Sequence, residues 1–262
     1  MFVRKTKSAQ AENAQEPQTA PSPPSLDDHM KDYLQKQPTE FHHLVVSSAV
    51  LYKDRLLLIQ RAAEERTYAN IWEIPGGSAD LSDKSVQDAI ARELKEETGL
   101  TLTKVVAEIL PPITFKTGWA PKERNWLRVS FVVDVEEVEE AVAKAKKLTV
   151  DLKQERKVGA GTSMAGKEEH DQAREVAAEY DRPGEVVVKH GDGSVDVVIT
   201  LDPKEHQNYV WATKEDIINA STLDDITTDG PPGEDGRLEL ISDTHRNALL
   251  EAFRIHEQRA TA

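Results

Sequence analysis

From residue 43 onward, apolar residues gather in short runs that polar turns separate. Residues 43–51 are apolar and β-branched and predict a strand. A turn at 54–55 and a second apolar run at 56–61 complete a predicted hairpin. Similar runs predict further strands at 103–110, 127–135, 195–201 and 208–212.

Helical signals lie between these strands. The longest predicted helix covers 85–98, with Asp83 or Ser85 as its N-cap. Gly99 follows it, where a helix end favours a residue that tolerates positive φ. The stretch ahead of it, 72–77, reads WEIPGG and is predicted to end in a loop, because Pro and two glycines stop regular structure. Strands mixed with helices indicate an α/β fold in which helices sandwich the sheet. Further helices are predicted at 213–219 and from 242 through 255.

Two segments lack this apolar pattern. Residues 1–38 are rich in Pro, Gln, Ala and Ser and predict a disordered N-terminal tail. Residues 136–194 hold fourteen acidic and ten basic residues and predict a solvated, charged insertion, with an exposed helix at 136–147. A substrate lid or a protein-binding arm is the alternative interpretation of this insertion. The remainder of 39–262 has the length of one compact domain.

The charge balance is strongly acidic, because 33 basic and 47 acidic residues give a formal net charge of −14 over 262 residues. This balance argues against binding to nucleic-acid polymers or anionic membranes, since both need clustered Lys and Arg. No run of eighteen apolar residues is present, so no transmembrane helix is expected. The absence of cysteine excludes zinc–thiolate sites, iron–sulfur clusters and cysteine nucleophiles.

The first residues bear on cellular location. Arg4, Lys5 and Lys7 could belong to a transit peptide. Glu12 and Glu16 follow at once, however, and such peptides are poor in acidic residues. We therefore expect a cytoplasmic protein, with mitochondrial import as the alternative.

The C-terminal half of the longest predicted helix concentrates acidic side chains. Glu93, Glu96 and Glu97 fall within an arc of about 100° on one helical face, where they repel one another. The helix dipole disfavours each anion at this end by roughly 0.3–1 kcal/mol. A bound cation would offset both costs, and ligands that are all oxygen favour Mg²⁺ or Mn²⁺. An acidic surface helix paired with Lys84 and Lys95 is the alternative.

Residues 92–100 read RELKEETGL and follow the WEIPGG stretch. Together they resemble the Nudix hydrolases, whose signature is G-x5-E-x7-R-E-U-x-E-E-x-G-U, with U a bulky apolar residue. The resemblance implies a Nudix-type α/β/α sandwich with a mixed sheet over about 41–260. The second half of the signature matches at Arg92, Glu93, Leu94, Glu96, Glu97, Gly99 and Leu100.

The first half of the signature differs. The distance from Gly77 to Arg92 is one residue longer than the pattern allows. The position expected to be Glu is Lys84 when counted back from Arg92, and Asp83 when counted forward from Gly77. An extra residue in the loop would let Asp83 pair with Arg92.

The resemblance implies a Mg²⁺-dependent pyrophosphohydrolase, with Mn²⁺ as the other candidate ion. Its substrate would be a small nucleoside diphosphate derivative, of the nucleoside triphosphate or nucleotide sugar type. The family's metal ligands correspond to the Gly77 carbonyl, Glu93, Glu96 and Glu97, and of these Glu96 and Glu97 are also expected to be catalytic. Arg92 would complete the catalytic set by holding the carboxylates in place.

The general base often lies outside the signature in this family. Glu205 is our candidate because it opens a predicted strand near the end of the sheet, and Glu123 is the second candidate. His206 is a neighbouring residue that could act as acid, base or phosphate donor. An ordinary surface residue is the alternative interpretation of each.

A stretch after the signature combines aromatic and basic residues and could stack a base and hold a phosphate. We expect Trp126 in the core because it leads into a strand, whereas Trp119 stays open. Arg61 could reach a phosphate or end an edge strand. The residues of this stretch are Phe115, Lys116, Trp119, Lys122, Arg124 and Trp126.

The alternative function is a catalytically inactive Nudix-fold module. Such a module would bind a nucleotide, or a protein partner through 136–194. Lys84 and the extra residue favour this alternative. Three mutually repelling acids favour the enzyme, because a module without catalysis has little reason to retain them.

Overall fold

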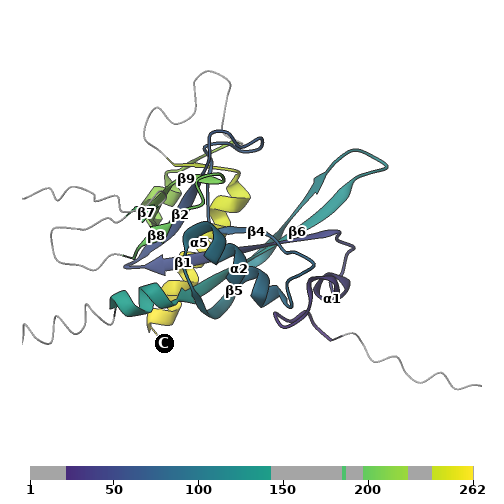
Figure 1. Cartoon of the computed structure of the whole chain (residues 1–262), viewed down its shortest axis with the longest axis horizontal. Helices are drawn as coiled ribbons and strands as arrows, with labels where there is room; N and C mark the ends of the chain where they lie inside the picture. Colours follow the sequence, from purple (N-terminus) through teal and green to yellow (C-terminus); the bar gives the residue numbers. More distant parts are fainter. Residues whose placement is uncertain (1–21, 143–184, 187–196, 224–237, 262) are drawn as a thin grey trace, which may run out of the picture.

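The computed structural model describes residues 22–142, 185–186, 197–223 and 238–261. A seven-stranded mixed sheet forms the centre of this part (Figure 1). Its strands are β1 (His43–Tyr52), β2 (Arg55–Arg61), β3 (Trp72–Glu73), β4 (Gly76–Ser78), β5 (Leu102–Thr117), β6 (Arg124–Val135) and β9 (His206–Thr213). The order is β3-β2-β1-β6-β5, with β4 paired to β1 and β9 paired to β2.

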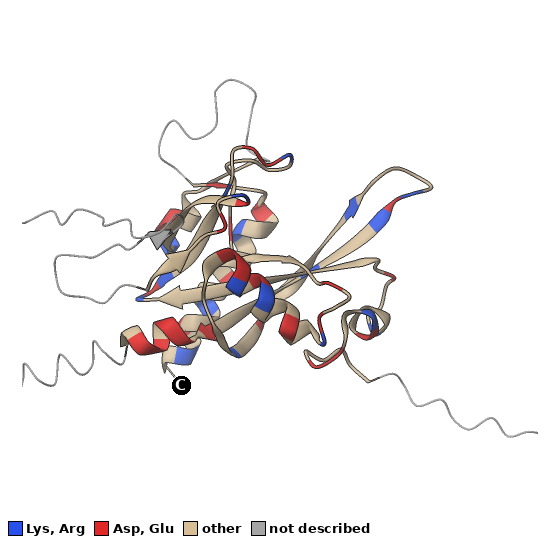
Figure 2. Ribbon diagram, viewed as in Figure 1, with Lys and Arg blue, Asp and Glu red and all other residues tan. Residues whose placement is uncertain are grey.

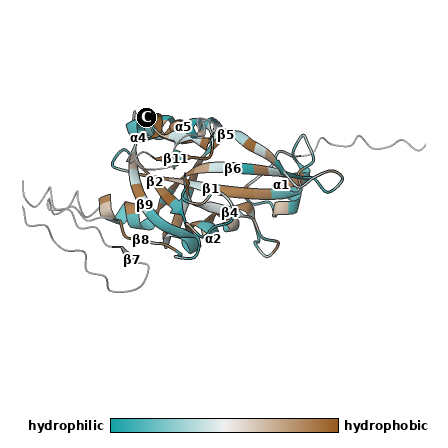
Figure 3. Ribbon diagram, turned by 90° about the horizontal axis from the view of Figure 1, so that it is seen from above, coloured by the Kyte–Doolittle hydropathy of each residue, from teal (hydrophilic) through white to brown (hydrophobic). Residues whose placement is uncertain are grey.

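Strand β1 lies in the middle of the sheet, parallel to β6 and antiparallel to β2 and β4. Nearly all of its residues are buried, because both faces of the sheet are covered, and Figure 3 shows its hydrophobic character. Lys53 and Asp54, with φ of 49° and 56°, make the tight turn into β2. The predicted hairpin is therefore present, with its turn one residue earlier than expected.

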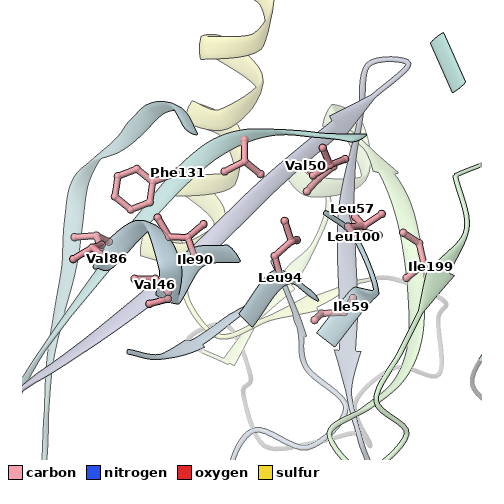
Figure 4. Close-up of a cluster of buried hydrophobic side chains, with 14 of the residues drawn as sticks. Val46, Val50, Leu57, Ile59, Val86, Ile90, Leu94, Leu100, Phe131 and Ile199 are labelled. Carbon is pink, nitrogen blue, oxygen red and sulfur yellow. The ribbon is translucent and has the colours of Figure 1, made fainter. Parts of the chain in front are cut away.

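Helices α2 (Val86–Thr98) and α5 (Asp243–Thr261) cover opposite faces of the sheet. The alternation along β2 shows this directly. Leu57 packs in the cluster that contains Leu94 of α2 (Figure 4), whereas Leu56 packs in the cluster that contains Phe253 of α5. The predicted α/β class with a helix-sandwiched mixed sheet is confirmed.

The stretch at 72–77, which is predicted to end in a loop, is partly extended. Strand β3 pairs with β2, and β4 pairs with Val46 and Ser47 of β1. Pro75 and the two glycines disguise these short strands in the sequence. The consequence is that the glycine turn is fixed by backbone hydrogen bonds to the centre of the sheet.

Strand β5 continues to Thr117, beyond the predicted end at 110. The register between β5 and β6 shifts between Ile109 and Ile113, which accommodates the two prolines. Proline is tolerated there because β5 is an edge strand of the sheet. In Figure 1 the hairpin of β5 and β6 extends well beyond the body of the domain.

The C-terminal elements follow the predicted order. The strand predicted at 208–212 is β9. Of the strand predicted at 195–201, only the two residues of β8 (Ile199–Thr200) are a strand among the described residues. The prediction at 213–219 matches α4, whose N-terminus is a capping box, and α5 extends six residues past the predicted 255. These remaining elements are β7 (Glu185–Val186), β8 (Ile199–Thr200), α4 (Lys214–Ile218), β10 (Ser221–Thr222) and β11 (Glu239–Leu240).

The predicted tail at 1–38 differs from the structure at its C-terminal end. Residues 1–21 lie outside the described part, but helix α1 (Met30–Gln35) is ordered. Tyr33 and Leu34 of α1 are buried in the same cluster as α2. The helix has only six residues, which are too few to show a periodic apolar pattern in the sequence.

The segment before α1 also completes the N-terminus of α2. The carbonyl oxygen of Asp28 accepts a hydrogen bond from Val86 N at 2.9 Å, and that of Leu26 accepts one from Gln87 N at 3.0 Å. The first amides of a helix have no partner within the helix, so this segment satisfies two of them. The domain therefore begins before residue 39.

Of the predicted insertion at 136–194, the described residues include 136–142, which are helical. Ala141 is buried in the cluster of α2, so this helix is not fully exposed as expected. Most of the insertion lies outside the described residues, and with it both the expected solvated segment and the alternative lid or arm. Among the helices that are described, none combines the length and apolar character needed to cross a membrane.

Candidate active site on helix α2

Local signals in the sequence place helix α2 and its carboxylates. The Ser85 side chain accepts a hydrogen bond from Asp88 N at 3.1 Å and caps the N-terminus, as expected. Gly99 ends the helix with φ of 72°. The apolar face, which includes Leu94, packs on the sheet. Of its acidic residues, Glu93 is half-buried, Glu96 is exposed and Glu97 is buried. Figure 2 shows acidic and basic residues next to one another along this helix.

Arg92 binds three carboxylates at once. It donates to both oxygens of Asp83 at 2.9 Å, and its Nη1 donates to Glu93 at 2.7 Å and to Glu96 at 3.0 Å. The hydrogen bonds to Asp83 contribute most to raising the pKa of Arg92, and the same bonds lower the pKa of Asp83. This is the pairing of Asp83 with Arg92 that the longer loop was expected to allow.

The glycine turn lies directly against this helix. Gly76 N donates to Glu97 Oε2 at 2.6 Å. Gly76 has φ of 156°, and a side chain at this position would collide with the Val46 carbonyl. A side chain on Gly77 would collide with the carboxylate of Glu93. The two glycines therefore allow the turn and the carboxylates to approach closely.

Glu97 is a buried carboxyl group whose environment disfavours the charged form. Burial raises its pKa to about 9, and the nearby carboxylates of Glu73, Glu93 and Glu205 add to this effect. The hydrogen bond from Gly76 opposes the shift without cancelling it. Burial also raises the pKa of Glu93, against the hydrogen bond from Arg92. A donor set of crowded carboxylate oxygens fits a hard divalent cation.

Glu73 of β3 is a second buried carboxylate, and sequence reasoning missed it. Arg61 Nη1 donates to it at 2.9 Å, and Arg128 Nη1 lies 3.8 Å away. Burial alone would raise its pKa, but His206, Arg128 and Arg61 together lower it to about 2. Arg61 thus forms ion pairs with Glu73 and Glu65. It ends β2, which lies between β3 and β1 and is therefore not the edge strand that the sequence suggested.

Residues at the start of β9 meet Glu97 from the other side. Ligand atoms of Glu97, Glu205 and His206 all lie within 4.8 Å of one another. Glu205 is exposed and His206 is buried. The structure therefore places Glu205 beside the carboxylates of α2, which is compatible with the expected role as base. No feature of the sequence alone indicated that β9 pairs with β2 in a register that brings Glu205 and His206 close to Glu97.

Other residues suggested by the sequence do not reach this cluster. Glu123, the second candidate base, pairs with Lys116 at 2.9 Å near the end of the β5–β6 hairpin, which points away from α2 (Figure 1). Trp119 in the same hairpin is 89% exposed. Trp126 was expected in the core, but it is half-buried and stacks on His43, so this prediction is wrong.

Comparison with known proteins shows which family this part of the chain resembles. Residues 42–160 match the family model described as the NUDIX domain. This range includes the glycine turn, the carboxylates of α2 and both strands of the long hairpin. Residues 42–160 are therefore similar to the NUDIX domain, as the resemblance implied.

Two relatives are similar to this chain over part of its length. A zebrafish (Danio rerio) protein named m7GpppN-mRNA hydrolase NUDT17 is 49% identical over 49 residues, which are 19% of this chain and 16% of that protein. A Citrobacter koseri protein named uncharacterized Nudix hydrolase NudL is 42% identical over 65 residues, which are 24% of this chain and 34% of that protein. This chain thus spans about a third or less of either relative.

A MutT protein from Methanosarcina mazei is a solved structure that resembles this chain. The similarity covers 85% of this chain and 99% of that one, with 16% identity and a TM-score of 0.42.

Proposed function

We propose that this protein is a pyrophosphohydrolase that depends on a divalent metal ion and cleaves the diphosphate linkage of a nucleoside diphosphate derivative. The observation that carries the proposal is the cluster of Glu93, Glu96 and Glu97, which Arg92 and the glycine turn hold together on α2. The NUDIX domain and the names of its relatives support the same class of reaction.

The arrangement assigns a role to each side chain. Glu93, Glu96, Glu97 and the Gly77 carbonyl would hold Mg²⁺, or Mn²⁺ in its place. A divalent ion bound there would neutralise the diphosphate and polarise its phosphorus. Arg92 would keep Glu93 and Glu96 in position through the hydrogen bonds that it already donates.

Glu205 would accept a proton from the water that attacks phosphorus, while the bond from that phosphorus to the bridging oxygen breaks. The products are a nucleoside monophosphate and a phosphorylated remainder. The exposure of Glu205 suits this role, because water and substrate can reach it from solvent.

A panel of nucleotides tests the proposal. It contains nucleoside triphosphates, nucleotide sugars, ADP-ribose, dinucleoside polyphosphates and capped RNA ends, each with Mg²⁺ or Mn²⁺. The variants are Glu96→Gln and Glu97→Gln, and Asp88→Asn serves as the control because it removes an exposed carboxylate from the same helix.

Metal-dependent turnover that is lost in both glutamine variants and kept in the control would support the enzyme. No turnover of any substrate, together with no binding of either metal ion, would contradict it. That result would instead favour a binding module, for which Lys84 at the expected Glu position is the specific observation.

A further inference from the structure

His206 is a buried imidazole without hydrogen bonds in the described structure. Its side chain is 1% exposed, and neither Nδ1 nor Nε2 has a hydrogen-bond partner among the described residues. Nε2 lies 3.8 Å from Glu97 Oε1 and 3.9 Å from Glu73 Oε1, which is too long for hydrogen bonds. Buried polar groups in native proteins are almost always satisfied, so this ring needs a partner.

The backbone on both sides of His206 is firmly held. His206 N donates to the Asp202 carbonyl at 2.8 Å, and the Glu205 carbonyl accepts from Ala62 N at 2.8 Å. The pairing of β2 with β9 is irregular here, because Arg61 faces His206 while the adjacent Gln60 faces Asn208. Such bulges re-aim side chains near functional sites. The ring is thus directed toward Glu97 by the fold itself.

Glu73 cannot complete the coordination of this ring. Its Oε1 accepts a hydrogen bond from Arg61 at 2.9 Å, and its Oε2 forms an ion pair with Arg128 at 3.8 Å, so both oxygens already face cationic groups. Glu97 and Glu205 remain as the oxygen donors that converge on His206.

We propose that His206, Glu97 and Glu205 form a second cation subsite with one nitrogen and two oxygen donors, which prefers Mn²⁺ or Co²⁺ to Mg²⁺. Donors bound at about 2.0–2.2 Å to one ion lie roughly 3–4.4 Å apart, so the 3.8 Å separation of Nε2 and Glu97 Oε1 fits. The exposed Glu205 can move the short distance that remains. Imidazole binds transition metals more strongly than it binds Mg²⁺, which prefers all-oxygen ligands.

The subsite shares Glu97 with the carboxylates of α2 and shares Glu205, the proposed base, with the reaction, so its role in hydrolysis rests on the proposed function. Metal binding itself does not depend on turnover and can be measured alone. This separates the two claims, because nitrogen coordination can be present in a protein that hydrolyses nothing.

Electron spin echo envelope modulation of the full chain with bound Mn²⁺ provides a direct test. Nitrogen modulation from a coordinated imidazole is expected in the wild type and should be lost in His206→Gln. His256→Gln is the control, since His256 lies on α5 beside Asp54, outside the cluster. Absence of nitrogen modulation in the wild type would overturn the subsite, whatever the stability of the variant.

Metal selectivity distinguishes a ligand from a structural residue. Loss of groups that merely orient metal ligands costs about 10–100-fold in metal affinity, so loss of a ligand should cost at least as much. We expect His206→Gln to weaken Co²⁺ binding by about tenfold or more while Mg²⁺ binding changes little. Equal losses for both ions would show that His206 only supports the fold, and would contradict the subsite.

Hydrolysis measured on the same samples separates the two proposals. Turnover without nitrogen coordination would remove the subsite and keep the enzyme. Nitrogen coordination without turnover would keep the subsite and remove the enzyme.

Discussion

Glu73 and Glu97 are both buried, both lie near His206, and differ in almost everything else. The pKa of Glu73 is lowered to about 2 because His206, Arg128 and Arg61 outweigh its burial. The pKa of Glu97 is raised to about 9 because burial dominates and the nearby carboxylates of Glu73, Glu93 and Glu205 add to it. Divergent environments of this kind mark functional pairs of titratable groups. Charged side chains of the protein thus compensate Glu73, whereas under the proposed function a cation from solution would compensate Glu97.

Of the substitutions that test this difference, Glu73→Gln should have the largest effect on the free energy of unfolding. Glu73→Gln leaves Arg61 and Arg128 partly buried without their carboxylate, which should lower the free energy of unfolding by about 3 kcal/mol. Chemical denaturation measures this change. Glu65→Gln is the matched control because it removes the more exposed partner of Arg61, and it should cost about 0–1 kcal/mol. Equal losses for the two variants would argue against the distinct role of Glu73.

Glu97→Gln should keep the stability of the protein and lose its hydrolytic activity. The amide keeps an oxygen for the hydrogen bond from Gly76 and is uncharged, as is the protonated carboxyl that a pKa of about 9 favours without metal, so stability without metal should not fall. Hydrolysis should fall by about 100-fold or more, because a ligand of the metal ion is lost. Steady-state kinetics and thermal unfolding on one preparation measure both. A marked loss of stability would show that the Glu97 charge is already compensated within the protein.

Arg92→Lys tests whether one guanidinium organises the α2 carboxylates. Lysine cannot reproduce the paired hydrogen bonds to Asp83 together with those to Glu93 and Glu96. We expect Mg²⁺ affinity to fall by about 10–100-fold, which calorimetric titration can measure. An unchanged affinity would mean that the glycine turn alone positions the carboxylates.

The smallest expected effect is at the beginning of α2. Ser85→Ala removes the cap on Asp88 N and should lower the free energy of unfolding by about 1 kcal/mol. Metal affinity should stay the same, because the ligands lie at the other end of the helix. A comparable loss of metal affinity would show that binding depends on the whole helix.

The α2 cluster could be predicted because its signals are local. The helix, its Ser85 cap and its Gly99 end follow from short-range patterns, and Glu93, Glu96 and Glu97 share one face for geometric reasons.

The partners of that cluster could not be predicted in the same way. Glu73 and His206 meet only because β3 and β9 both pair with β2, at positions set by the register of the sheet. Register depends on packing of the whole domain, which no short window of sequence contains.

The same reason explains the errors in the fold. The prolines of β5 are tolerated because β5 is an edge strand. Helix α1 is stable because Tyr33 and Leu34 dock on the core, although six residues form too short a helix to persist alone. In both cases tertiary contacts override the local signal.

The central claim is that Glu97 takes its cation from solution, and metal-dependent stabilisation tests it most directly. Binding to the folded state should raise the free energy of unfolding by about 2.7 kcal/mol when Mg²⁺ or Mn²⁺ is at 100 times its dissociation constant. We predict that thermal unfolding of the wild type shows this increase, that Glu73→Gln retains it, and that Glu97→Gln loses most of it. Equal stabilisation of the wild type and Glu97→Gln by metal, or none in the wild type, would contradict the account.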